Sequence, residues 1–123
     1  MPKIVPINNY LRRKYKRMKI NIDVVLKSPK GEILKFQDES GSTQDLTLKE
    51  CMFRALLNYH PDKDKNLSSS EKFKLGKIAD HVYKSVTETE LTAEEVSLIK
   101  ERINLAYAQS VVFAAYNAIE GTA

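Results

Sequence analysis

The chain has few of the residues that mark disulfide-rich, fibrous or membrane-spanning proteins. Its 123 residues include one cysteine, four glycines, four prolines and no tryptophan, and no apolar run approaches the ~20 residues of a bilayer span. Cys51 has no partner for an internal disulfide, which fits a reducing compartment, and a lone cysteine is more often a core residue than a nucleophile. Charges at the N-terminus stand where a secretory signal needs an apolar core. We therefore expect a cytoplasmic protein with no membrane partner.

Charge is unevenly distributed along the chain. The formal net charge is +4, yet residues 1–19 hold seven basic groups and no acidic one, so the remainder sums to −3. This pattern predicts a basic N-terminal arm over residues 1–19 that is drawn to phosphate backbones or to an acidic protein surface. Nucleic-acid binding, with tyrosines stacking on bases, and a solubilising or assembly-directed tail both remain open. The candidate partner-binding residues of the arm are Arg12, Arg13, Lys14, Lys16 and Arg17.

The sequence after the arm predicts an α+β fold that is mainly α, as a single domain over residues 20–121. Apolar residues alternate with polar ones from Ile20 to Leu26, which is the period of a half-buried strand. Ser28–Gly31 is typical of a turn, and Ile33–Phe36 offers a second strand. We expect a β-hairpin over residues 20–37, an exposed connection over Gln37–Asp45 and a helical body of three to four helices over residues 46–121.

Three helix starts in that body carry the same capping signal, a hydroxyl residue followed three positions later by glutamate. The first helix should span residues 48–59, because Pro61 disfavours helical geometry in the residue before it. The last helix is apolar nearly all round and should end at Gly121. It is either the central helix of the core or a homo-oligomer interface, and Ser110 is either its cap or a helical residue. The three capping pairs are Thr47 with Glu50, Ser68 with Glu71 and Thr92 with Glu95.

The polar residues give no catalytic or metal-binding constellation. The spacing Asp62-x-Asp64-x-Asn66 begins like a calcium-binding EF-hand loop, but Leu67 stands where the turn needs glycine and Phe73 where a glutamate should close the shell. Two histidines and one cysteine offer no zinc cluster. We therefore expect a protein that is not an enzyme and that needs no metal or cofactor.

One loop carries a family resemblance. Residues 54–63 read Arg-Ala-Leu-Leu-Asn-Tyr-His-Pro-Asp-Lys and are followed by Glu-Lys-Phe-Lys at residues 71–74. This stretch, about residues 48–83, resembles the second helix, loop and third helix of J-domain co-chaperones. The resemblance implies that His60, Pro61 and Asp62 contact an ATP-driven chaperone and stimulate its hydrolysis, with Lys49 and Arg54 aiding docking. The same tripeptide also fits a helix stop followed by turn-forming residues.

A second resemblance covers about residues 20–121. A short hairpin precedes Leu46–Glu50, Glu71–Lys74, Leu91–Val96, Ile99–Glu101 and Ala118–Gly121, and this succession looks like small proteins of unassigned function encoded by tailed bacteriophages and prophages. It implies an accessory protein made inside a bacterial host. The leading interpretation is a small non-catalytic phage-type protein that binds a host or phage macromolecule, with a protein partner expected. The alternatives are nucleic-acid binding through the arm and J-domain-like action through the His-Pro-Asp loop.

Overall fold

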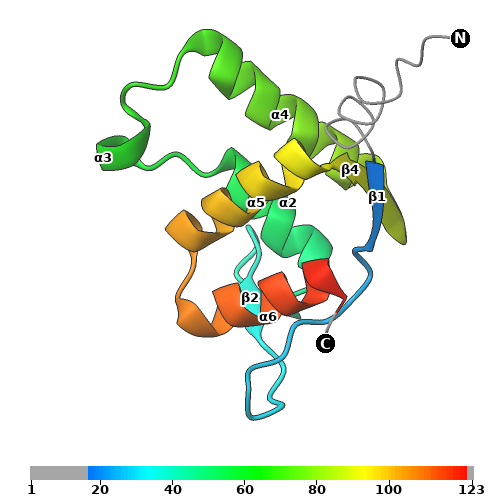
Figure 1. Ribbon diagram of the computed structural model, residues 1–123. Helices are drawn as coiled ribbons and strands as arrows, with labels where there is room; N and C mark the ends of the chain where they lie inside the picture. The colour runs from blue at the N-terminus through cyan, green and yellow to red at the C-terminus, as the bar shows by residue number, and fades with distance from the viewer. Residues whose placement is uncertain (1–16, 122–123) are drawn as a thin grey trace, which may run out of the picture.

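The computed structural model of the protein describes residues 17–121. Its fold is α+β and mainly helical, as predicted (Figure 1). No helix within those residues is both long and apolar enough to cross a membrane. The elements in chain order are β1 (Arg17–Asn21), β2 (Lys35–Gln37), β3 (Thr43–Asp45), α2 (Leu48–Leu57), α3 (Pro61–Asp64), α4 (Ser69–Lys84), β4 (Glu88–Thr92), α5 (Ala93–Ala106) and α6 (Gln109–Glu120).

Helix α2 is the centre of the fold. It packs against α4 and α5 and also contacts α6, and it buries five residues at helical spacing, Leu48, Cys51, Met52, Ala55 and Leu56. The last helix is therefore not the central one. Helix α6 buries only Ala114 and Ala115 fully, and its apolar circumference is explained by contacts with three neighbours, α5, α2 and β1.

The three predicted helix starts are confirmed. The Thr47 hydroxyl accepts the Glu50 amide at 3.2 Å, and Ser68 and Thr92 each form a complete capping box with the glutamate three residues later. Helix α2 ends at Leu57, two residues before the predicted end, because the backbone at Asn58 is already extended. Ser110 is not a cap, since Ala108 precedes the first turn of α6. Gly121 ends α6 with a φ of 71°, as expected of a left-handed glycine.

The strand pairing differs from the prediction. Strand β1 pairs with the distant β4, antiparallel, with Met18 opposite Leu91 and Ile20 opposite Thr89. The predicted turn does form, because the Gly31 amide donates to the Ser28 carbonyl at 2.8 Å. Its two arms pair over a short distance, at the bridge between Lys27 and Ile33 and through the Leu34 amide, which donates to the Leu26 carbonyl at 2.9 Å.

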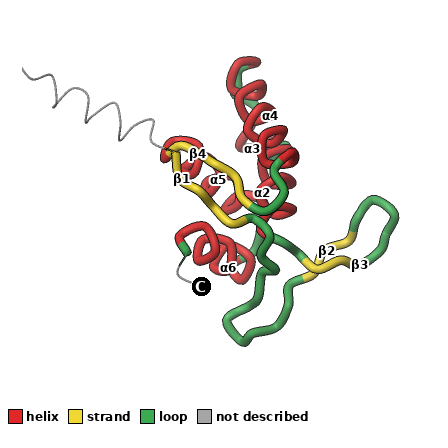
Figure 2. Tube along the Cα trace, turned by 90° about the vertical axis from the view of Figure 1, so that its right-hand side faces the viewer, coloured by secondary structure: helices red, strands yellow, loops and turns green. Residues whose placement is uncertain are grey.

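The segment predicted as an exposed connection, Gln37–Asp45, contains strand β3, which pairs with β2. Figure 2 shows this β2–β3 hairpin projecting away from the helices, while the β1–β4 pair lies beside them. The predicted hairpin over residues 20–37 therefore forms only beside its turn, and its outer residues pair with β4 and β3, because residue periodicity marks strands but does not name their partners.

Candidate functional site

The His60-Pro61-Asp62 segment lies between α2 and α4, at the start of the short helix α3. Pro61 takes the first helical position, where its missing amide hydrogen costs nothing and its fixed φ suits the helix. Pro61 and Asp62 are exposed and His60 is half-buried. Pro61 therefore begins a helix, while the preceding helix has already ended at Leu57.

A buried ion pair ties this loop to α5. Arg102 donates from Nη1 and Nη2 to the two Asp64 carboxylate oxygens, each at 2.8 Å, and the two residues are only 5% and 2% exposed. Arg102 Nη2 also donates to the Asn58 carbonyl at 2.5 Å, and the His60 amide donates to Asp64 Oδ2 at 2.8 Å. Both ends of the segment from Asn58 to Asp64 are thus fixed. We call these contacts of Arg102, Asp64, Asn58 and His60 the loop clamp.

The loop clamp keeps both Asp64 and Arg102 ionised. The hydrogen bonds from Arg102 hold the pKa of Asp64 well below its usual range, and the Asp64 carboxylate raises the pKa of Arg102. Sequence reasoning did not single out this pair. The available signal was the position of Arg102, which shares the buried face of α5 with Ile99 and Ile103, where a charged residue needs a partner.

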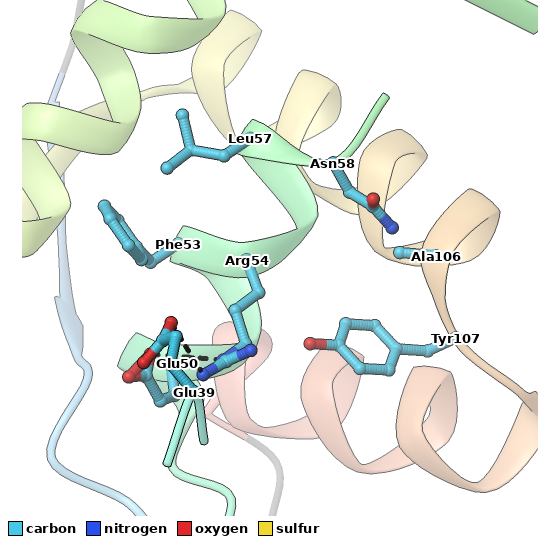
Figure 3. A pocket seen from close by; sticks show the side chains of 8 residues that line it. All are labelled: Glu39, Glu50, Phe53, Arg54, Leu57, Asn58, Ala106 and Tyr107. Atoms are coloured by element: carbon cyan, nitrogen blue, oxygen red, sulfur yellow. Dashed lines mark ion pairs between the residues drawn. The ribbon is translucent and has the colours of Figure 1, made fainter. Parts of the chain in front are cut away.

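A hollow of about 410 Å³ opens beside the end of α2 (Figure 3). Arg54 forms two long ion pairs in it, from Nη2 to Glu39 and from Nε to Glu50, each at 3.7 Å. Its guanidinium carbon lies 4.4 Å from the centre of the Phe36 ring. We call this cavity the Arg54 hollow; its lining residues are Glu39, Glu50, Phe53, Arg54, Leu57, Asn58, Ala106 and Tyr107.

Tyr107 faces Arg54 across the hollow. Figure 3 shows the Tyr107 hydroxyl pointing toward the guanidinium, whereas the Asn58 side chain extends toward Ala106, away from Arg54. Burial raises the pKa of Tyr107 to about 12, so its hydroxyl keeps its proton. The backbone of Asn58 is fixed on both sides, because its backbone N–H donates to the Arg54 carbonyl and its backbone carbonyl accepts from Arg102. The loop clamp therefore also positions one wall of the Arg54 hollow.

The two basic residues suggested as docking helpers serve different contacts. Lys49 donates to the Ser85 carbonyl at 2.7 Å and lies 5.5 Å from the Tyr83 ring centre, whereas Arg54 faces its hollow. The described hydrogen bonds and ion pairs link neither of them to His60, Pro61 or Asp62.

The basic arm falls mostly outside the described residues, which include only Arg17 of its five candidate binding residues. Arg17 begins β1 opposite Thr92, and its Nη1 lies 3.4 Å from the Glu90 carbonyl. It lines a hollow of about 510 Å³ together with Lys74, Lys77, Ile78, His81, Glu90 and Glu95. We call this the Arg17 hollow.

Among the described residues we find neither a cluster of metal ligands nor a reactive thiol. Residues 17–121 hold no group of three or more histidine, cysteine or acidic side chains that could bind a metal ion. Burial raises the pKa of the Cys51 thiol to about 12, which keeps it an unreactive thiol. The chain matches no family model, and no curated protein or solved structure is detectably similar to it.

Proposed function

We propose that the chain is a small non-catalytic accessory protein of the phage type that binds another macromolecule, and that its principal partner is a protein. The observation that carries this proposal is the loop clamp. A buried ion pair adds little net stability compared with apolar residues of the same size, so its use here is best explained by the shape that it imposes. A loop fixed in advance binds with a smaller entropy cost.

The surface around the clamped loop has the composition of a protein-binding patch. Leu57 and Tyr59 are 54% and 53% exposed, and both border a hollow of about 220 Å³ whose lining includes Asp64 and Arg102. Lys72 Nζ lies 5.8 Å from the Tyr59 ring centre. Aromatic and apolar side chains beside fixed charges are typical of the residues that dominate protein interfaces.

Affinity capture from a bacterial host lysate tests this proposal. The parent protein should retain a specific partner, Tyr59→Ser should lose it, and Val86→Ser should keep it. Val86 is the control because it is 78% exposed and lies after the end of α4, away from the proposed surfaces. Circular dichroism and urea unfolding check that all three proteins fold alike. Equal capture by the parent and both variants, or robust turnover of a nucleotide by the purified protein, would contradict the proposal.

A chaperone is the specific partner that the J-domain resemblance implies. The exposure of Pro61 and Asp62 on a fixed loop favours it. The parent protein should then stimulate the ATPase of a heat-shock chaperone, and His60→Gln should remove that stimulation without changing the free energy of unfolding by more than about 1 kcal/mol. A parent protein that gives no stimulation ends this version of the proposal.

Nucleic-acid binding is a second candidate function, favoured by the Arg17 hollow. Three basic side chains and His81 line it beside two glutamates, and Arg17 directly follows the other four candidate binding residues of the arm. Contact with about five phosphates of duplex DNA should give a log-log salt slope near −4. Lys77→Gln should weaken binding, and a chain lacking residues 1–16, which keeps β1 whole, should bind with a much shallower slope. Binding that is insensitive to salt contradicts this function.

A further inference from the structure

We propose that the Arg54 hollow binds the C-terminal carboxylate of a partner polypeptide whose last residue is apolar. The inference rests on the proposed function in that it names the chemical group by which a protein partner is recognised. It concerns a cavity that the His-Pro-Asp segment does not line.

Arg54 is a cation without a close acceptor. Within residues 17–121, its Nε is enclosed and has no hydrogen-bond partner, and its two ion pairs are 3.7 Å long. Charge-assisted hydrogen bonds to carboxylates form at about 2.7–2.9 Å, so neither glutamate satisfies the guanidinium. The Phe36 ring against one face of the group holds its plane in position. A carboxylate that reached hydrogen-bonding distance would therefore meet an oriented partner.

Glu39 occupies the place of the ligand only loosely. Its side chain is 93% exposed and belongs to the turn between β2 and β3. An exposed pair of this length contributes almost nothing to stability, so displacing Glu39 costs little. Glu39 thus acts as an internal competitor, and removing its charge should strengthen the binding of an external carboxylate.

The remaining lining distinguishes a chain terminus from an acidic side chain. The protonated Tyr107 hydroxyl supplies a further donor beside the guanidinium (Figure 3). Phe53 and Leu57, one turn apart on α2, supply an apolar wall in the same hollow (Figure 3). A C-terminal apolar residue carries its carboxylate and its apolar side chain on one carbon, which fits both parts, whereas aspartate or glutamate leaves the apolar wall unfilled. The volume lies within the range of about 300–1,000 Å³ that is usual for ligand sites.

Titration of the isotope-labelled protein with three small probes, followed by NMR, tests the inference. N-acetyl-L-leucine presents a terminal carboxylate beside an apolar side chain, N-acetyl-L-leucinamide lacks the carboxylate, and N-acetyl-L-aspartic acid α-amide carries only a side-chain carboxylate. The first should bind and shift the signals of Arg54, Asn58 and Tyr107, and it should bind at least about five times more tightly than the other two. Equal binding of the leucine compound and its amide overturns the inference, and preferential binding of the aspartate compound overturns the choice of a terminus.

Variants decide whether Arg54 is the binding group. Arg54→Gln should weaken the binding of N-acetyl-L-leucine about ten-fold or more, Tyr107→Phe should weaken it less, and Glu39→Gln should strengthen it two- to five-fold. Lys84→Gln is the control, because it removes the same charge from an exposed position on α4. Arg54→Lys keeps the charge and should still lose most of the affinity, since an ammonium group cannot form the two-pronged contact. Unchanged binding in both Arg54 variants contradicts the inference.

The outcome separates this inference from the proposed function. Partner capture that depends on Tyr59, together with no binding of N-acetyl-L-leucine, would remove the carboxylate site and leave the protein-binding function standing. Binding of the probe without any captured partner would do the reverse.

Discussion

Arg102 is the residue whose loss should destabilise the fold most among the charged residues. Arg102→Leu leaves the Asp64 carboxylate buried and unpaired, which should lower the free energy of unfolding by about 3–5 kcal/mol. The double variant Arg102→Leu/Asp64→Leu removes both charges and should lose clearly less than the sum of the single variants. Urea unfolding measures the free energy of unfolding of the double variant and of both single variants, Arg102→Leu and Asp64→Leu. Lys84→Ala is the control, since it breaks an exposed ion pair with Asp80 and should cost at most about 0.5 kcal/mol. Additive losses would contradict the coupling.

Asp64 should also make the fold sensitive to acid. Its pKa is lowered chiefly by the hydrogen bonds from Arg102, so the folded value lies below the value of about 3.9 in the unfolded chain. The stability that this carboxylate contributes is complete above about pH 4 and is lost as the pH falls from there toward the folded pKa. Urea unfolding between about pH 6 and pH 3 should show a steeper loss for the parent than for Asp64→Asn. Equal slopes would contradict this role.

Two other carboxylates share the acid response. Hydrogen bonds with Ser40 lower the pKa of Asp38, and those with Ser68 lower the pKa of Glu71. Both groups are exposed, so we expect Asp64→Asn to reduce the pH dependence without abolishing it. A Ser68→Ala variant should change it much less, because an exposed carboxylate is well hydrated in either state.

At the scale of secondary-structure elements, the helices could be predicted and the strand partners could not. A helix start such as Thr92 with Glu95 depends on residues three positions apart, so the sequence displays it directly. Strand β1 pairs with β4 although α2 and α4 both lie between them in the sequence. The alternation of apolar and polar residues placed Ile20 in a strand. A period of two, however, carries no information about the partner strand. Strand β2 overlaps the predicted second strand, but β3 was missed because its residues are polar and exposed.

Helix α6 lacks the N-terminal cap that the other long helices have. Ala108 has the extended backbone of a capping residue, with φ −75° and ψ 169°, but no side chain that can accept a hydrogen bond. Ala108→Ser should therefore raise the free energy of unfolding by about 0.5–1 kcal/mol, measured as a higher melting temperature. Thr92→Ala, which removes an existing cap, should lower it by about 1 kcal/mol. A destabilised Ala108→Ser variant would show that α6 starts elsewhere.

At the scale of the whole molecule, we propose α6 as the surface through which two copies of the chain would associate. Phe113 is half exposed, and most of the other apolar residues of this helix are only partly buried. A homo-oligomer through α6 predicts that the mass seen in sedimentation rises with protein concentration, and that Phe113→Ser returns it to the mass of one chain. An association that survives this substitution places the interface elsewhere, and a parent protein with the mass of one chain at every concentration contradicts the oligomer.

In the candidate sites, as in the fold, features set by neighbouring residues were predictable from the sequence and features set by distant contacts were not. The exposed loop at Pro61 was visible in the sequence because proline and aspartate act on their immediate neighbours. The loop clamp joins Asp64 to Arg102 across 38 positions, and the Arg54 hollow draws its lining from the β2–β3 turn, α2 and the end of α5. Such groupings arise only when the helices have packed, which explains why local spacing did not reveal them.

The pairing of β1 with β4 has a consequence for the protein during its synthesis. On the ribosome β1 emerges early, yet its partner strand emerges only after α2 and α4 have been made. Until then Ile20, which is 4% exposed in the finished fold, has nothing to cover it, and the strand offers its open edge to any passing chain. A chaperone or a second nascent chain can add a strand there before β4 has been made, so this is a step at which the chain can assemble wrongly.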